Sequence, residues 1–193
     1  MRGASSSLLT VALLVAARPA AAQLWEVHLG GVASYASRGE FGPGAGAVLG
    51  IAPGRFAYAG LRYVVYAGAT TMSGAPPSQT DVRNRTQTFS VDLGLMFPAG
   101  RADIMPGIGF GAVHFDQATR PSGSGSAWQS SGATEFMATP GIAAEFHLGK
   151  VALIPDLQYR LAHVPALPYS VQPNGLIASV RVVLAFEINR IRQ

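Results

Sequence analysis

The chain has 193 residues, of which 49% are hydrophobic and only 12% are charged, about half the charged fraction of an ordinary soluble domain. This length suits one domain, and the absence of cysteine excludes both a disulfide framework and a cysteine-ligated metal site. The formal net charge of +4 comes from scattered basic residues, which argues against nucleic acid as a partner.

The first 22 residues have the three regions of a secretory signal peptide. Arg2 supplies a positive charge, residues 8–17 form an apolar core, and residues 20–22 give a small-residue cleavage pattern. The apolar core is too short to cross a bilayer, which requires ~20 residues. We therefore expect a cleavable signal over 1–22, export through the inner membrane, and one mature domain over 23–193.

Eight segments of the mature chain alternate between apolar and polar or small residues, as strands with two unlike faces do. Long connections at 35–43, 68–85, 116–132 and 163–174 alternate with tight turns near 53–55, 98–101 and 148–150. Consecutive hairpins of this kind predict an all-β, antiparallel, up-and-down arrangement. The expected strands are 24–34, 44–52, 56–67, 86–97, 102–115, 133–147, 151–162 and 175–189.

Three prolines fall inside the expected strands. Pro106, Pro140 and Pro155 each lack the backbone donor that a ladder needs. We therefore expect irregular or bulged pairing at these positions.

The two faces of the strands indicate which one is buried. One face is uniformly apolar, whereas the other mixes glycines, hydroxyls and charges. A solvated exterior would be rich in lysine, yet the mature chain has a single lysine, Lys150, in a turn. We therefore expect the apolar face to meet lipid and the mixed face to fill the lumen of a closed eight-stranded transmembrane barrel. The side chains expected to point outward at mid-height are Leu93, Leu95, Ile108, Phe110, Leu157, Val182 and Leu184.

Charges in a narrow lumen must be paired, because an unpaired buried charge is heavily penalised. The stretch LIPDLQYRLA, residues 153–162, shows the pattern, since Asp156, Gln158 and Arg160 share one face of an otherwise apolar strand. Within the network we expect Arg160 and Arg181, on neighbouring strands, to join Glu26 and Glu187, with room for Asp156 to join at a different height. The expected lumen network comprises Glu26, Arg62, Asp92, Asp103, Glu135, Glu145, Asp156, Arg160, Arg181 and Glu187.

The pattern resembles the small eight-stranded outer-membrane β-barrels of Gram-negative bacteria, of the outer membrane protein A and X type. The features are the signal ending AAAQ, the eight strands, the turns PGR, PAGR and LGK, and the last strand VRVVLAFEI. The resemblance implies residence in the bacterial outer membrane, termini in the periplasm, loops at the cell surface, and contact with membrane lipid and the assembly and secretion machinery. One departure is that Phe186 is followed by EINRIRQ, so the terminal aromatic signal for assembly is displaced.

Four functions remain open at this point. The first is a monomeric structural or surface-interaction scaffold that displays four extracellular loops to an external ligand. The others are a minor pore for small solutes, a lipid-modifying hydrolase, and a soluble lipocalin-like carrier. The last would carry Gly-x-Trp on its first strand, where this sequence has Leu24, Trp25 and Glu26.

The histidines provide the only hint of site chemistry. Glu26-x-His28 and Glu145-x-His147 each place an acid and a histidine on one face, which suits a hydrogen-bonded pair or two metal ligands. We expect these groups to satisfy one another. The sequence lacks a G-x-S-x-G elbow, a phosphate loop and a dinucleotide fingerprint. We therefore expect no enzyme activity, no catalytic residues, no cofactor and no metal.

Overall fold

The computed structural model describes residues 25–37, 41–54 and 56–188, so the expected signal peptide lies outside the described residues. No helix in this described part is long and apolar enough to cross a membrane. The strands, in chain order, are β1 (Trp25–Ala36), β2 (Pro43–Pro53), β3 (Ala57–Tyr66), β4 (Thr70–Ser73), β5 (Thr80–Leu95), β6 (Phe97–Ala99), β7 (Ala102–Pro121), β8 (Gln129–Leu148), β9 (Val151–Ala162) and β10 (Gly175–Ile188).

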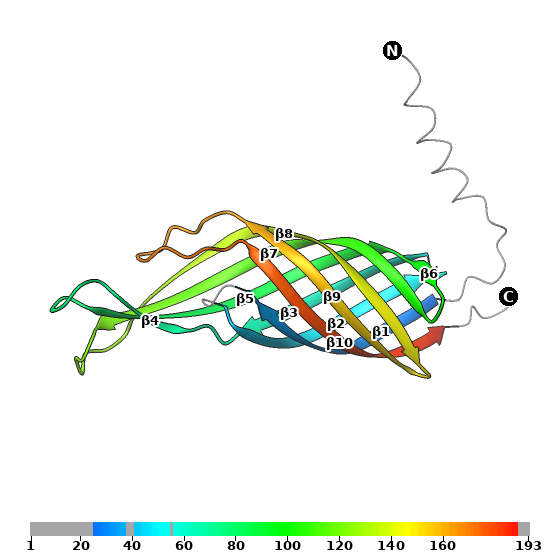
Figure 1. Cartoon of the computed structure of the whole chain (residues 1–193), viewed down its shortest axis with the longest axis horizontal. Coiled ribbons are helices and arrows are strands. Elements are labelled where there is room, and N and C mark those ends of the chain that lie inside the picture. The colour runs from blue at the N-terminus through cyan, green and yellow to red at the C-terminus, as the bar shows by residue number, and fades with distance from the viewer. Residues whose placement is uncertain (1–24, 38–40, 55, 189–193) are drawn as a thin grey trace, which may run out of the picture.

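The strands form one antiparallel sheet that closes on itself (Figure 1). Each long strand pairs with the next along the chain, and β1 pairs with β10 from Trp25↔Ile188 to Ala36↔Ile177. The short strands β4 and β6 pair with β5 and β7 respectively. The barrel wall therefore consists of eight long strands, which confirms the predicted fold and leaves no open edge within the wall.

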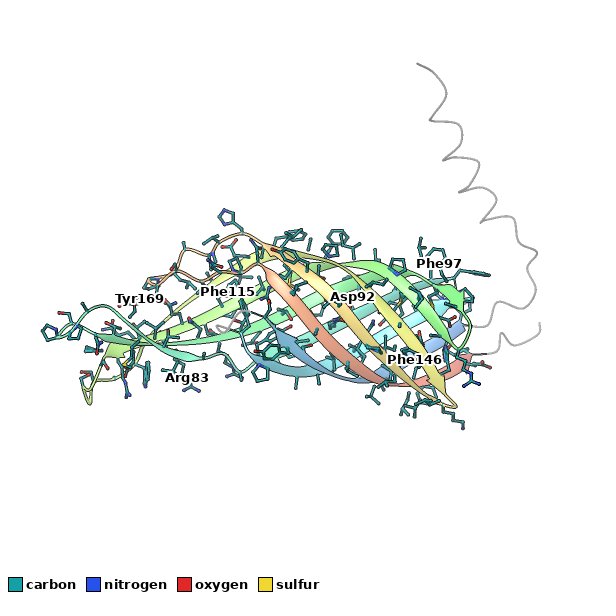
Figure 2. The ribbon with its side chains drawn as sticks, in the orientation of Figure 1. Arg83, Asp92, Phe97, Phe115, Phe146 and Tyr169 are labelled. Atoms are coloured by element: carbon teal, nitrogen blue, oxygen red, sulfur yellow. The ribbon has the colours of Figure 1, made fainter. Side chains whose placement is uncertain are left out.

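The outward face of the wall is apolar. Six of the seven side chains expected to point outward are exposed, and Ile108, the seventh, is half-buried. Phe97 and Phe146 lie near the end that carries the short turns, where aromatic rings suit a membrane interface (Figure 2). This exterior contradicts the soluble carrier, which needs a polar outer surface. The six exposed side chains are Leu93, Leu95, Phe110, Leu157, Val182 and Leu184.

Each of the three prolines interrupts one ladder and leaves the ladder on its other side intact. Pairing of β7 with β5 and β6 breaks at Pro106, and pairing of β8 with β9 breaks at Pro140 and again at Pro155. The continuous ladders β7–β8 and β9–β10 run through the same residues. The register is the same on both sides of every break, so the pairing is irregular, as predicted, but not bulged.

Three strands extend far beyond the barrel wall. A transmembrane strand needs ~9–11 residues, whereas β5 has 16 and β7 and β8 have 20 each. Residues 80–85, 116–121 and 129–136, flanked by β4, form a sheet that projects from the loop end (Figure 1). The sequence predicted loops at 80–85, 116–121 and 129–132, because the alternation of apolar and polar residues fades where both faces of a strand meet water.

Candidate functional site: the barrel lumen and the surface above it

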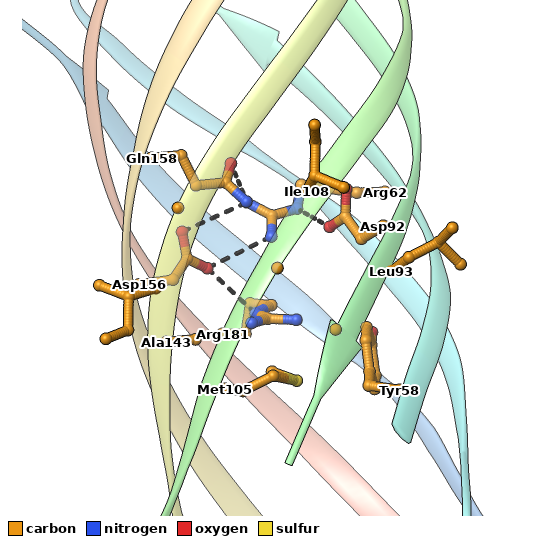
Figure 3. A pocket seen from close by; sticks show the side chains of 14 residues that line it. Tyr58, Arg62, Asp92, Leu93, Met105, Ile108, Ala143, Asp156, Gln158 and Arg181 are labelled. Carbon is orange, nitrogen blue, oxygen red and sulfur yellow. Dashed lines mark hydrogen bonds and ion pairs between the residues drawn. The ribbon is translucent and has the colours of Figure 1, made fainter. Parts of the chain in front are cut away.

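The middle of the lumen is crossed by a network of four charges, one each from β3, β5, β9 and β10 (Figure 3). Nε of Arg62 donates to Asp92 over 2.7 Å, and its other nitrogens reach Asp156 at 3.4 Å. Nε of Arg181 lies 3.1 Å from the same Asp156 carboxylate. Gln158 accepts from Arg62 over 3.1 Å. Two arginines and two aspartates balance one another, as buried charges require.

Glycines on the lumen face make room for the larger groups. A Cβ at Gly50 or Gly60 would overlap the ring or hydroxyl of Tyr58, which lies across both strands. A Cβ at Gly109 would meet Asp92 at 2.6 Å. The remaining cavity in the charge network is about 20 Å³, enough for about one water molecule.

The outer end of the lumen is filled differently, by aromatic rings around one guanidinium. Cζ of Arg160 lies 3.8 Å from the ring centre of Phe41, and Nε donates to the carbonyl of Pro173 over 2.7 Å. Phe41 also makes edge contacts with Tyr66 and Phe115. A cation over an aromatic face is electrostatically favourable. The arginine is fully buried, and in the described part of the chain no carboxylate pairs with it.

The connection between β9 and β10 covers this end. The amide of Gln117 on β7 donates to the carbonyl of Tyr169 and accepts from its backbone N–H, at 3.0 and 2.9 Å. Val171 of the same connection is 3% exposed and packs into the apolar cluster that contains Phe115. Figure 2 shows Tyr169 and Phe115 at the loop end of the barrel. The outer mouth is therefore capped.

The end with the short turns holds two acids and two histidines. Glu26 and His28 lie on β1, and Glu145 and His147 lie on β8. Nε2 of His147 also lies 3.3 Å from Asp103 on β7. A cavity of about 520 Å³ leads from this cluster to the surface.

Comparisons with known proteins address the fold. No protein-family model matches the sequence, and no curated protein sequence matches it significantly. The structure is similar to that of a major outer membrane protein from Thermus thermophilus, with a TM-score of 0.62 and 13% identity over 85% of this chain and 99% of that chain. The chain has the fold of an eight-stranded outer-membrane β-barrel.

Two further solved structures match at lower scores. The N-terminal β-barrel domain of Pseudomonas aeruginosa OprF gives a TM-score of 0.46 at 13% identity over 86% of this chain and 98% of that one. Ail, the attachment invasion locus protein of Yersinia pestis, gives a TM-score of 0.44 at 13% identity over 86% of this chain and 99% of that one.

Apart from these matches, the closed ladder and apolar exterior meet the requirements of a lipid bilayer. Spanning barrels of this build belong to outer membranes, so we place this barrel in a bacterial outer membrane.

Two acids of the expected network are not enclosed by the lumen. Glu135 lies on the part of β8 above the wall, 3.7 Å from the exposed His163. Glu187 is exposed at the other end, where it lines the 520 Å³ cavity with Glu26 and His147. Both positions have the inward parity, but Glu135 lies above the wall, and Glu187, opposite Glu26 in register, lies at the open end of the lumen.

The register rules out one joint network of Arg160 and Arg181 with Glu26 and Glu187, because the two arginines lie far apart along their strands. Arg160 pairs in register with Gly175, whereas Arg181 pairs with Ile154. The two arginines therefore lie six residues apart along the strands, roughly 20 Å at about 3.3 Å per residue. Parity places side chains on a face but says nothing about height, so Arg181 meets Asp156 and Arg160 meets aromatic rings.

Sequence reasoning missed a chain of polar contacts on the outward face, just above the apolar exterior. Tyr63 donates to Gln87 over 2.8 Å, and the amide of Gln87 donates to Asp116 over 3.4 Å. Asp116 lies 3.1 Å from Nε2 of His114, whose Nδ1 lies 2.7 Å from the hydroxyl of Thr134. We name these five residues the polar belt. Their signal in the sequence is the change from apolar to polar side chains on the outward parity near the loop end.

Proposed function

We propose that the protein is a closed, monomeric outer-membrane scaffold that presents its projecting sheet to an external protein partner. The closed lumen supports a scaffold rather than a pore. Its middle is crossed by paired charges with a residual cavity of about 20 Å³, and its outer end is capped by the β9–β10 connection.

The observation that carries the interaction role is the edge of β8. Pairing of β8 with β7 extends to Thr119↔Gln129, whereas its pairing with β9 begins only at Met137↔Ala162. In the described structure, residues 129–136 therefore lack a strand partner on their second side. Such an edge offers backbone donors and acceptors to an added strand, a common mode of peptide recognition.

Cysteine labelling tests the display of this sheet, because the chain has no native cysteine. We expect Ser130→Cys to react with a membrane-impermeant maleimide on intact cells. The matched variant Lys150→Cys, in the turn between β8 and β9 at the other end, should react only after lysis. The reverse pattern would place the projecting sheet in the periplasm and end the proposal.

Peptide selection tests the edge itself. The protein, folded in nanodiscs, is panned against a random heptapeptide library, and we expect enriched peptides with alternating β-branched residues. The double variant Gln129→Lys and Ala133→Lys, which charges the edge, should lose these peptides. Retention of the same peptides by the variant would locate binding elsewhere.

Planar-bilayer recording tests the pore alternative. We expect no steady conductance from the wild type. A steady conductance that changes in Arg181→Ser would replace the scaffold with a pore, because this change opens the charge network.

A lipid-modifying hydrolase is the second candidate, favoured by one observation in the polar belt. The hydroxyl of Thr134, the imidazole of His114 and the carboxylate of Asp116 form one line of contacts at 2.7 and 3.1 Å. A hydroxyl beside a base that is oriented by an acid is the arrangement that nucleophilic hydrolases use. Hydrolysis of phospholipid micelles by the wild type but not by Thr134→Val would support this candidate, and we expect neither to hydrolyse them.

A further inference from the structure

Two Glu-x-His motifs meet at the short-turn end of the lumen. Residues 26–30 read EVHLG on β1, and residues 145–149 read EFHLG at the end of β8. In each motif the acid and the histidine are two residues apart on a strand and point to the same face. Since β9 and β10 separate β1 from β8 in the sheet, the two pairs approach one another across the lumen.

Glu26, Glu145 and His147 each offer a ligand atom within 4.8 Å of those of the other two, and His28 lies beside both carboxylates. Nε2 of His28 lies 3.5 Å from Oε1 of Glu26 and 3.5 Å from Oε1 of Glu145. Nδ1 of His147 lies 3.9 Å from Oε1 of Glu26, and its Nε2 lies 3.7 Å from Oε1 of Glu145. Zinc binds nitrogen and oxygen at ~2.0–2.2 Å, which puts neighbouring ligands of a tetrahedron roughly 3.3–3.6 Å apart.

Direct pairing leaves two of these groups unsatisfied. Glu145 is fully buried and His28 is 1% exposed. Within the described part of the chain, neither carboxylate oxygen of Glu145 and neither ring nitrogen of His28 has a hydrogen-bond partner. The separations of 3.5 Å are long for a charge-assisted hydrogen bond, which is ~2.7–2.9 Å. A bound cation would satisfy both groups.

The surroundings also suit a metal. Asp103 lies 3.3 Å from Nε2 of His147, so it can accept that N–H and leave Nδ1 to coordinate, as carboxylates behind metal-bound histidines do. The 520 Å³ cavity, lined by Glu26, His147 and Glu187, gives access from the aqueous side. Mixed imidazole and carboxylate ligands favour a transition metal over calcium or magnesium.

We propose that Glu26, His28, Glu145 and His147 bind one zinc ion at the periplasmic end of the lumen. This departs from the expectation that the pairs satisfy one another, and it is independent of the proposed surface function. The ion ties β1 to β8 across the barrel and neutralises the two carboxylates.

Zinc titration of the full mature protein, refolded in detergent and freed of metal, tests the proposal. Competition with a chromophoric chelator should show one zinc per chain. Cobalt substitution should give the visible absorption of a tetrahedral ion. Asp103→Asn should weaken zinc binding by about 10–100-fold.

Two substitutions remove ligands, and one pair serves as the control. Glu145→Gln and His147→Gln should each abolish stoichiometric binding, and His147 lies at the accessible rim, so its replacement spares the buried packing. Glu135 and His163 form another acid–histidine pair, 3.7 Å apart, outside the lumen. The double variant Glu135→Gln and His163→Gln should bind zinc as the wild type does. Migration of unheated and boiled samples on a gel verifies that each variant is folded.

The outcomes separate a metal site from an ion-pair cluster. No stoichiometric zinc in the folded wild type, or equal binding by wild type and a folded His147→Gln, overturns the proposal. Loss of zinc in the control pair alone would move the site to the cell surface and also overturn it.

Discussion

Arg181 and Arg160 lie on neighbouring strands, face the same lumen and are both buried, yet their surroundings are opposite. Arg181 shares the Asp156 carboxylate with Arg62, inside a network whose charges balance. Arg160 is stacked on Phe41 and donates to the carbonyl of Pro173, and in the described part of the chain no carboxylate pairs with it. The comparison teaches that the middle of the lumen is held by charge balance and the outer end by packing.

The largest expected effect comes from unbalancing the middle of the lumen. Asp156→Asn removes the carboxylate that Arg62 and Arg181 share, and breaking a buried pair in this way costs about 3–5 kcal/mol. The free energy of unfolding, from urea titration in lipid vesicles, measures it. Asp81→Asn, which breaks the more exposed pair with Arg120, should cost less than about 1 kcal/mol. Equal losses of unfolding free energy in both variants would show that the lumen network stabilises the barrel no more than an exposed ion pair does.

An arginine one residue away from Arg181 should behave differently because it faces lipid. Val182 is 52% exposed on the apolar exterior, and Val182→Arg should destabilise the barrel by about 2–4 kcal/mol at mid-height. Val164→Arg, in the connection after β9, should have little effect in the same urea titration. A stable Val182→Arg variant would contradict the assignment of the exterior to lipid.

The two buried arginines should respond differently to the same neutral replacement. Arg160→Met removes a charge that pairs with no carboxylate in the described part of the chain, and it keeps much of the volume against Phe41. We expect its unfolding free energy to stay within about 1.5 kcal/mol of the wild type. Arg181→Met leaves Asp156 with one arginine instead of two and should cost more. If Arg160→Met proved the more damaging of the two, packing would not be what holds the outer end.

The smallest effect is expected in the polar belt, outside the lumen. Thr134→Val removes a hydroxyl that contacts the half-exposed His114, and a net hydrogen bond of this kind contributes about 1 kcal/mol or less. Urea titration of Thr134→Val and Asp156→Asn under the same conditions compares their losses in unfolding free energy. A loss as large as that of Asp156→Asn would mean that the belt, too, is a structural network.

The fold could be predicted from the sequence because a membrane enforces one strict pattern. Strands such as 86–97 must keep Phe89, Val91, Leu93 and Leu95 on one face over the thickness of the lipid, and that alternation is visible in one sequence. The projecting parts of β5, β7 and β8 were missed because water on both sides removes this constraint. The alternation of apolar and polar residues therefore predicted strands only in the part of the chain that crosses the bilayer.

The sequence predicted which residues belong to the lumen site but only some of the contacts between them. Parity alone placed Arg62, Asp92, Asp156 and Arg181 on the inner face, where the structure joins them. It could not give the register, which separates Arg160 from Arg181 along their strands. Nor could it show that Phe41, in a long connection, would fold inward onto Arg160.

A closed barrel comes apart first along the seam where its strands share the fewest hydrogen bonds. Pro140 and Pro155 interrupt the same ladder, between β8 and β9, whereas β9 and β10 pair without interruption from Gly175↔Arg160 to Leu184↔Val151. Pulled from its C-terminus, the chain should therefore release β9 and β10 together as one hairpin. The prolines thus weaken one seam of the eight-stranded wall, so that the β9–β10 hairpin separates from β8 more easily than β9 separates from β10.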